Sequence, residues 1–88
     1  MEGPWYCYML RCSDGTFYAG IANDLEDRLR EHNRGKDSAY TAKRRPVRLV
    51  WSETHPKKEA ARRREIEIKG WSRRKKAGLL LKKTADAV

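Results

Sequence analysis

Two aromatic and apolar segments near the start of the chain lie on either side of a short turn. Residues 5–11 read Trp-Tyr-Cys-Tyr-Met-Leu-Arg, and residues 17–21 read Phe-Tyr-Ala-Gly-Ile. Runs that are rich in aromatic and apolar residues and lack a chain breaker favour β-strands. The intervening Ser13-Asp14-Gly15 has the composition of a turn. The two segments therefore predict a β-hairpin.

The length of the hairpin loop decides which side chains share a sheet face. A two-residue turn places Tyr8 and Tyr18 on opposite faces. A three-residue loop with Gly15 in the left-handed conformation pairs Tyr8 with Gly20 and brings both tyrosines to one face. A slip of one residue would exchange the two faces. The residues themselves leave both registers open.

The rest of the chain predicts one further strand and three helices. Asn23 and Glu26 form a capping pair that starts the first helix. Pro56 suits the first turn of the second helix, and Ser72 caps the third. The expected bounds are residues 23–33 for the first helix, 47–51 for the strand and 56–69 for the second helix, with a basic loop at 36–46.

Length and composition are those of one small domain. The 88 residues bury roughly two-thirds of the surface of the unfolded chain, which allows one modest core. We expect an α+β fold of order β-β-α-β-α-α over residues 1–83, with 84–88 as a C-terminal tail. No apolar run reaches the roughly 20 residues that span a bilayer, and a signal-peptide pattern is absent, so we expect a cytoplasmic protein. Cys7 and Cys12 are expected as reduced thiols, since their spacing suits neither a disulfide framework nor a zinc site.

The charge is positive and unevenly distributed. Lys and Arg number 21 against 12 Asp and Glu, a net charge of +9. Residues 57–88 contain twelve basic and four acidic side chains, net +8, whereas residues 1–56 contain nine and eight, net +1. This asymmetry indicates an acidic partner, most often nucleic acid. A solvated basic helix that serves solubility would give the same composition, so the charge alone does not decide between them.

A few polar side chains suit the hydrolysis of a phosphodiester. That reaction needs a base for water, a cation for the charge of the phosphorane, and a metal ion near the leaving oxygen. Arg28 can hold a non-bridging oxygen with its forked guanidinium. Glu65 shares a helix face with Ala61 and Ile68, and a single carboxylate can hold one Mg²⁺.

Four motifs in this chain resemble, in order and spacing, those of the GIY-YIG nuclease superfamily. They are Tyr6-Cys7-Tyr8, Tyr18-Ala19-Gly20, Arg28-x-x-x-His32 and Ala61-x-x-x-Glu65-x-x-Ile68-Lys69. The first two are similar to the signature tripeptides, the third to the next family motif and the fourth to the metal-site helix. The stretch from Gly35 to Val47 is similar to the small stand-alone bacterial members. The resemblance covers about residues 5–80.

The resemblance implies a three-stranded antiparallel sheet flanked by helices, with a metal-dependent DNA endonuclease site on one face. It also implies that the two tyrosines share that face, which favours the three-residue loop. Mg²⁺ is the expected cofactor, with Mn²⁺ as a substitute, and the products carry 5′-phosphate and 3′-hydroxyl ends. The implied roles are water activation by Tyr8, support by Tyr18, phosphate stabilisation by Arg28, assistance to proton transfer or positioning of groups by His32, and metal binding by Glu65.

Further basic residues are expected to contact phosphate. Lys69 matches a recurrent basic position of the family helix. A free tyrosine titrates near pH 10, but Arg28, Lys69 and a metal ion would all favour the phenolate of Tyr8. We therefore expect activity to rise toward alkaline pH. The other expected contacts to phosphate or DNA are Lys43, Arg44, Arg45, Arg73 and Arg74.

Two functions from different classes fit these residues. The first is a Mg²⁺-dependent endonuclease of DNA repair or processing. Phosphate contacts position a protein without specifying sequence, so we expect single-stranded or branched and flapped DNA to be cut without strong sequence specificity. The alternative is a nucleic-acid-binding module of the same fold that cuts nothing. We favour the nuclease, because a pure binding module has no use for an inward carboxylate beside Arg and Lys.

Overall fold

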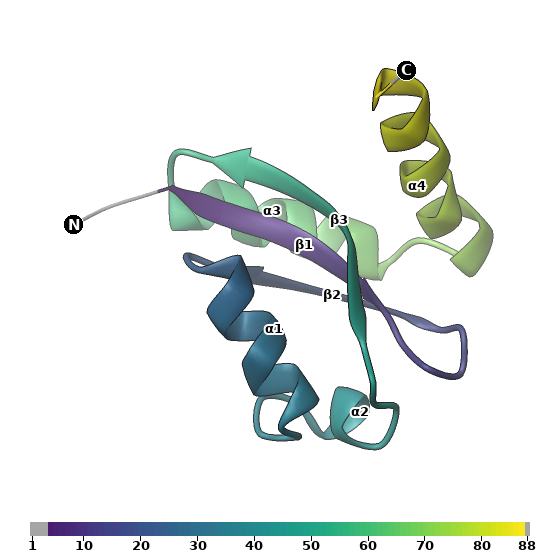
Figure 1. Ribbon diagram of the computed structural model, residues 1–88. Helices are drawn as coiled ribbons and strands as arrows, with labels where there is room; N and C mark the ends of the chain where they lie inside the picture. Colours follow the sequence, from purple (N-terminus) through teal and green to yellow (C-terminus); the bar gives the residue numbers. More distant parts are fainter. Residues whose placement is uncertain (1–3, 88) are drawn as a thin grey trace.

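An antiparallel sheet of three strands, in the order β2-β1-β3, lies at the centre of the fold. The computed structural model describes the backbone of residues 4–87 and the side chains of residues 4–80. This architecture is α+β and confirms the expected fold class (Figure 1). The elements are β1 (Trp5–Arg11), β2 (Phe17–Ala22), α1 (Leu25–Asn33), α2 (Ala39–Ala42), β3 (Arg48–His55), α3 (Lys58–Lys69) and α4 (Arg73–Ala87).

Helices cover both faces of the sheet, with α1 on one and α3 on the other (Figure 1). Successive side chains of a strand point to opposite faces, and β1 therefore contributes to two apolar clusters. One cluster lies beneath α3 and α4, and the other lies beneath α1. The first contains Cys7, Met9, Ala19, Trp51, Ile68 and Leu79, and the second contains Tyr8, Leu10, Cys12, Ala22 and Val47.

The hairpin has the register of the three-residue loop. Gly15 has a φ of +85°, a conformation that glycine adopts without steric cost, and its N–H donates to the Cys12 carbonyl at 2.9 Å. Tyr8 consequently pairs with Gly20. Tyr8 and Tyr18 lie together in the cluster on the α1 face.

Two helices begin at different residues from those predicted. Asp24, not Asn23, caps α1, and its carboxylate accepts the Asp27 N–H at 2.9 Å. A charged oxygen is a strong acceptor at the positive end of a helix. Pro56 precedes α3 instead of lying in its first turn, because β3 extends to His55 and occupies the chain up to that point.

The segment around β3 also differs from the prediction. β3 continues beyond its expected end because it pairs along the whole of β1, as far as Trp5 opposite His55. The loop expected at residues 36–46 contains the short helix α2. Ser38 caps this helix by accepting the Tyr40 N–H at 3.1 Å.

At the C-terminus, α4 runs to Ala87, so the helix continues where a tail was expected from residue 84. Residues 1–3 and 88 lie outside the described residues, and the domain limit at residue 83 stays a prediction. No helix in the described part of the chain combines the length and the apolar character needed to cross a membrane.

Two local predictions are confirmed. Cys7 and Cys12 are both free and buried. At the start of α4, the Lys75 N–H donates to Ser72 Oγ at 3.2 Å, as expected of a capping residue.

Replacing Gly20 by alanine is expected to destabilise the protein by about 1–3 kcal/mol, the usual cost of overpacking a core. A Cβ atom at Gly20 would lie 2.5 Å from Tyr8 Oη and 2.7 Å from Cζ. Tyr8 cannot swing aside, because it is only 2% exposed and its hydroxyl is hydrogen-bonded. Urea unfolding measures the change. Gly78→Ala is the matched control, since its Cβ would meet nothing within 4 Å and alanine favours helix; equal stability of the two variants would contradict this account.

Candidate active site

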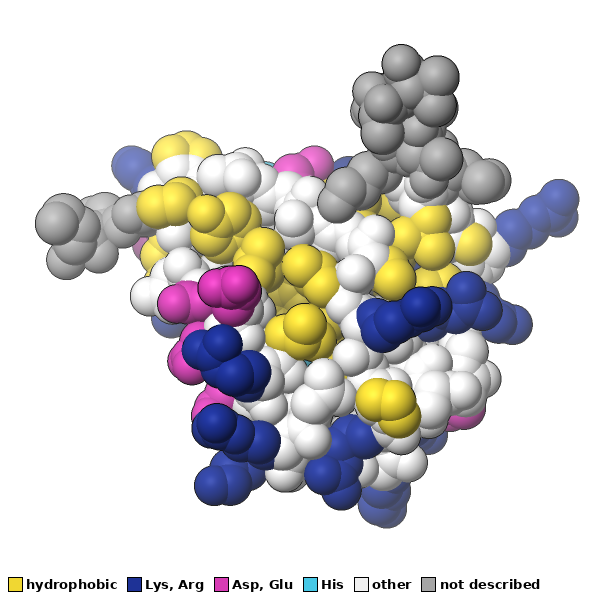
Figure 2. Space-filling view, viewed as in Figure 1, with side chains coloured by type: hydrophobic (Ala, Val, Ile, Leu, Met, Phe, Trp, Pro, Cys, Tyr) yellow, Lys and Arg dark blue, Asp and Glu magenta, His cyan; other side chains and the backbone are white. Residues whose placement is uncertain are grey.

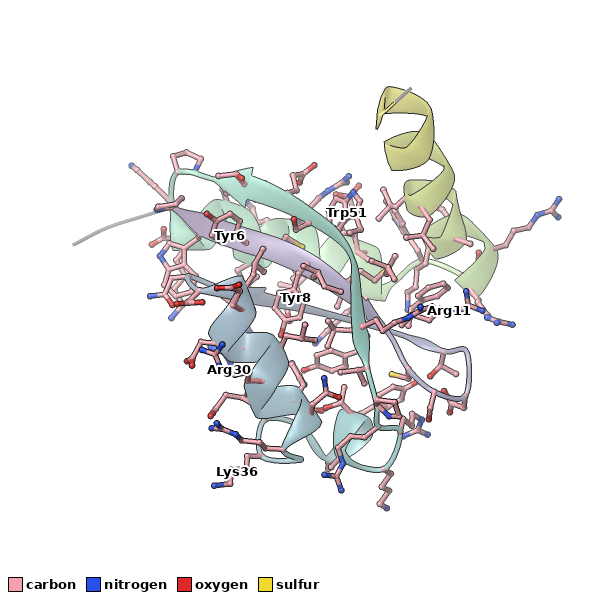
Figure 3. All side chains as sticks on the ribbon, viewed as in Figure 1. Tyr6, Tyr8, Arg11, Arg30, Lys36 and Trp51 are labelled. Carbon is pink, nitrogen blue, oxygen red and sulfur yellow. The ribbon has the colours of Figure 1, made fainter. Side chains whose placement is uncertain are left out.

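The centre of the site is a hydrogen bond between a strand and a helix. Tyr8 projects from β1 on the side that faces α1 (Figure 3). Its hydroxyl lies 2.9 Å from Nε2 of His32, and both side chains are buried. The glycine at position 20 leaves the space over β2 that the Tyr8 ring occupies. This contact joins the first signature tripeptide to the Arg-x-x-x-His motif.

His32 is held at both ring nitrogens. Nδ1 lies 2.8 Å from Thr41 Oγ1, and Nε2 lies 2.8 Å from Asp37 Oδ2. A carboxylate only accepts hydrogen bonds, so the proton of a neutral imidazole is on Nε2, directed toward Asp37. Nδ1 then accepts the hydroxyl proton of Thr41. Tyr8 consequently shares a nitrogen that already carries a proton.

Arg28 belongs to the same network. It lies one turn before His32 on α1, and its Nη1 donates to Asp37 Oδ1 at 3.0 Å. The Arg28 side chain is 37% exposed and the Asp37 side chain 20%. The carboxylate of Asp37 thus bridges the guanidinium and the imidazole, one oxygen on each.

Tyr18 forms the wall of the site toward α3. Its ring meets the His32 ring edge-on, with centroids 5.2 Å apart, and stacks on Tyr40 at 6.0 Å. Lys69 Nζ lies 5.3 Å from the centroid of the Tyr18 ring, a cation–π distance. Tyr18 therefore connects the His32 network to the last turn of α3.

Glu65 lies on α3 with its side chain only 12% exposed. Lys69 Nζ is 3.0 Å from its Oε2, and Arg62 Nε is 3.7 Å from its Oε1. The same helix face buries Ala61 and Ile68, as the spacing predicts. Through Lys69, the carboxylate lies beside Tyr18 at the β2 side of the sheet.

Burial dominates the electrostatics of the two central groups. Burial raises the pKa of Tyr8 above its ordinary value; Tyr18, Asp37 and Glu65 add to this, while Arg28 opposes it. Burial also lowers the pKa of His32, against the effect of the Asp37 carboxylate. The expectation that Arg28 favours the phenolate is confirmed in direction, but the net shift of the Tyr8 pKa is upward. Burial and the neighbouring carboxylates outweigh the effect of Arg28.

Sequence reasoning missed three residues of this network. They are Asp37, Thr41, which is completely buried, and Tyr40. A signal for Asp37 was present, because it is the only acidic residue between positions 34 and 46 of a basic stretch. For Tyr40 and Thr41 the signal was the resemblance of residues 35–47 to the small stand-alone bacterial members, which assigned neither residue a role.

Some of the residues predicted to contact DNA are hydrogen-bonded within the protein, and others are exposed without such a bond to any described residue. Arg44 donates to Asp14 Oδ2 at 3.0 Å and lies 3.8 Å above the Tyr40 ring. Arg45 donates to the Ala42 carbonyl at 2.9 Å. These arginines hold the loop around α2. By contrast, Lys43 and Arg74 are exposed on the surface, while Arg73, also exposed, donates to the Gly15 carbonyl at 3.1 Å.

The fold and these motifs are those of a nuclease domain. The sequence matches the GIY-YIG catalytic domain over residues 4–77, and the chain therefore belongs to the GIY-YIG family. A UPF0213 protein of Staphylococcus aureus is 45% identical over 75 residues, covering 85% of this chain and 92% of the relative.

Two solved structures are similar as well. A UPF0213 protein of Bacillus halodurans, determined by solution NMR, has 44% identity and a TM-score of 0.56, with coverage of 88% of this chain and 82% of that one. A protein of E. faecalis, also determined by solution NMR, has 37% identity and a TM-score of 0.63, with coverage of 97% and 93%. Both confirm the fold class.

GIY-YIG nucleases are generally metal-dependent. Among the described side chains, no three His, Cys, Asp or Glu residues come together as a metal site. Mg²⁺ often takes one or two carboxylates and completes its coordination with water and substrate phosphate. The largely buried carboxylate of Glu65 fits that mode of binding as a single protein ligand, provided that its ion pair with Lys69 breaks.

Acidification is expected to destabilise the protein through His32. The imidazole titrates near its ordinary pKa of 6.5 in the unfolded chain and below that value in the folded protein. Between these two values the unfolded chain binds a proton that the folded protein excludes, so the free energy of unfolding falls as pH drops through 6.5 and is highest above it. Urea unfolding at a series of pH values tests this. The control variant His55→Gln should show the same fall in stability at low pH, since His32 is unchanged in it. A free energy of unfolding of the wild-type protein that stays constant between about pH 5.5 and 7.5 would contradict this prediction.

Proposed function

We propose that this GIY-YIG protein is an active metal-dependent endonuclease that hydrolyses DNA phosphodiester bonds. One observation carries the proposal: Tyr8, His32 and Arg28 form one contiguous network that lies beside the carboxylate of Glu65. These are a base, a proton acceptor, a phosphate-binding cation and a metal ligand, the groups that phosphodiester hydrolysis requires.

In the proposed reaction, Tyr8 Oη takes the proton of the attacking water. A phenol must first lose its own proton to do so, and Nε2 of His32, at 2.9 Å, would accept it once that nitrogen no longer carries the proton directed toward Asp37. Because burial raises the pKa of Tyr8 in the free protein, the positive charge that favours the phenolate would come from a metal ion held by Glu65. The expected rise of activity toward alkaline pH stays part of this proposal.

The remaining residues act on the phosphate. Arg28 stabilises the negative charge of the phosphorane with its guanidinium. Glu65 would hold the metal ion, Mg²⁺ or Mn²⁺, which when bound supplies positive charge near the leaving oxygen. Lys69 is released from Glu65 in that case and contacts the phosphate, while Tyr18 keeps the His32 ring in place by edge-on packing.

A basic surface next to the site supports a nucleic-acid substrate. A cleft of about 460 Å³ is lined by Arg11, Arg73 and Arg74 above the apolar side chains of Phe17, Ala77 and Leu80. Figure 2 shows Lys and Arg side chains bordering apolar ones at the base of α4, and Figure 3 labels Arg11 there. Within residues 4–80, none of these three arginines has a carboxylate partner. Their unpaired charge suits a polyanion.

The basic surface connects with the site around the end of the hairpin. A second cleft, of about 190 Å³, is lined by Thr16, Phe17, Tyr40, Arg73 and Lys76. It shares Phe17 and Arg73 with the larger cleft, and Tyr40 stacks on Tyr18 of the site. A strand leaving the site can therefore follow one continuous basic path. We propose single-stranded or branched and flapped DNA as substrate, and DNA repair or processing in the cytoplasm as the setting.

Glu65→Ala is expected to lower metal-dependent cleavage by about a hundredfold or more, because a bound metal ion is worth several kcal/mol to the transition state. Salt-sensitive DNA binding should persist, since phosphate contacts by Lys and Arg supply it. The assay uses end-labelled single-stranded, duplex and flapped DNA with Mg²⁺, Mn²⁺ or EDTA. Glu67→Ala, on the exposed side of the same helix and paired with Arg64, is the matched control.

Each outcome of that assay has a distinct meaning. If the Glu65 variant cleaves DNA as well as the wild-type protein does, Glu65 is not the metal ligand. Binding without cleavage by wild-type protein, on every DNA and with either metal ion, would favour the alternative of a binding module of this fold.

Tyr8→Phe is expected to reduce turnover by about a hundredfold or more, the usual contribution of a general base. The variant keeps the buried ring and loses only the hydroxyl, so its melting temperature should stay close to that of wild type. Tyr6→Phe removes a hydroxyl from the same strand, two residues away, that takes no part in the network. Unchanged turnover of the folded Tyr8 variant would leave Tyr8 with a packing role only.

A further inference from the structure

Asp37 contacts two groups that the proposed reaction uses. One is the Arg28 guanidinium, which binds the phosphate, and the other is the His32 imidazole, which takes the proton of Tyr8. Oδ1 of Asp37 accepts from Arg28 Nη1 at 3.0 Å, and its Oδ2 accepts from His32 Nε2 at 2.8 Å. The two oxygens of a carboxylate and two non-bridging oxygens of a phosphate present similar acceptors to a guanidinium. The Asp37 carboxylate thus occupies an anion-binding position.

The contact between Asp37 and His32 also determines whether the imidazole can accept a proton from Tyr8. Nε2 must carry a proton to pair with the carboxylate, and the Tyr8 hydroxyl lies 2.9 Å from the same atom. While Asp37 is in place, Nε2 therefore has no lone pair for the proton of Tyr8.

The tautomer of His32 with its proton on Nδ1 also has a hydrogen-bond partner in the structure. If Asp37 leaves, the proton moves from Nε2 to Nδ1 by exchange with solvent, with no net gain or loss. Nδ1–H then donates to Thr41 Oγ1 at 2.8 Å, and the Thr41 hydroxyl can donate to the Ser38 carbonyl at 3.3 Å. Nε2 becomes an acceptor that faces Tyr8.

The Asp37 side chain lies at the edge of the network, in a loop between two helices. Asp37 lies between α1 and α2, after Gly35, which has a φ of +78°. The structure gives the Asp37 backbone no hydrogen bond to any described residue, and its side chain is 20% exposed. The neighbouring residues are held, since the Lys36 N–H donates to the Glu31 carbonyl at 3.1 Å and the Ser38 carbonyl accepts the Ala42 N–H at 2.9 Å. The Asp37 side chain is itself fixed by its contacts with Arg28 and His32, so a competing anion can displace the carboxylate by rotation of this side chain.

We infer that Asp37 is an internal competitor of the substrate phosphate for Arg28, and that the same carboxylate keeps the proton on Nε2 of His32 until it is displaced. Phosphate binding displaces the carboxylate, and the displacement frees Nε2 of His32 to accept the proton of Tyr8. Asp37 in this way links occupation of the phosphate position to activation of the base. The inference rests on the proposed function, because it assumes that Arg28 binds the phosphate of the substrate.

The first test compares binding by three proteins in EDTA, where no cleavage occurs. The probe is a short oligothymidylate, and the proteins are wild type, Asp37→Asn and Asp27→Asn. Asp27 is the matched control, since it pairs with the exposed Arg30 on the same helix and its loss changes the net charge equally. Removing the competitor should tighten binding by Asp37→Asn by about two- to fivefold, the size of a partly exposed ion pair. Asp27→Asn should gain less, because salt screens an exposed charge.

The second test follows the displacement directly in the wild-type protein. Nitrogen-15 NMR of the His32 ring reports which nitrogen carries the proton, and the carboxyl carbon-13 signal of Asp37 reports its ion pairs. Saturation with the oligothymidylate should shift both signals together and move the His32 proton to Nδ1. In free Asp37→Asn, His32 should already resemble the bound wild type.

Several outcomes would overturn the inference. Binding by folded Asp37→Asn that is no tighter than by Asp27→Asn would show that Asp37 does not compete with phosphate. Unchanged NMR signals of Asp37 and His32 in the saturated wild-type complex would also show that phosphate does not displace Asp37. If Asp37→Asn does not fold, this NMR experiment on the wild-type protein is the deciding test. Wild-type protein that neither binds nor cuts any DNA would instead overturn the proposed function itself.

Discussion

The register of the β1–β2 hairpin is the constraint on which the site depends. With Gly15 in the left-handed conformation, Tyr8 faces Gly20 and shares a sheet face with Tyr18. A shift of one residue would send one of the two tyrosines to the α3 face and break the group that they form around His32. Gly20 has a second role in the same register, because the absence of a side chain makes room for the Tyr8 ring.

A buried polar network then fixes the geometry of the centre. His32 has no exposed surface, and each of its ring nitrogens has a partner. Buried polar groups are costly unless they are paired, so the positions of Tyr8, Thr41 and Asp37 are mutually determined. In the same network, the Asp37 carboxylate contacts Arg28 and the proton of His32 Nε2 at once.

The site is assembled from both layers of the fold. α1 contributes Arg28 and His32 from one face of the sheet, and α3 brings Glu65 and Lys69 to the β2 side from the other. Lys69 lies over Tyr18 and joins the two groups. The basic clefts at the end of the hairpin continue from this junction toward α4. The residues proposed for catalysis and for DNA binding thus meet where β2 is covered from both faces.

Much of the fold and the candidate site follows from sequence, because their determinants are local. The turn between residues 11 and 17, the one-turn spacing of Arg28 and His32, and the inward position of Glu65 each depend on a few neighbouring residues. The loop length that sets the hairpin register was left open by the residues themselves. Other features needed the tertiary structure. The pairing of Asp37 with Arg28 and His32, and the raised pKa of Tyr8, depend on which groups packing brings together and on how much water it excludes. Sequence spacing contains neither quantity, since distance and burial arise only when separate elements pack against one another.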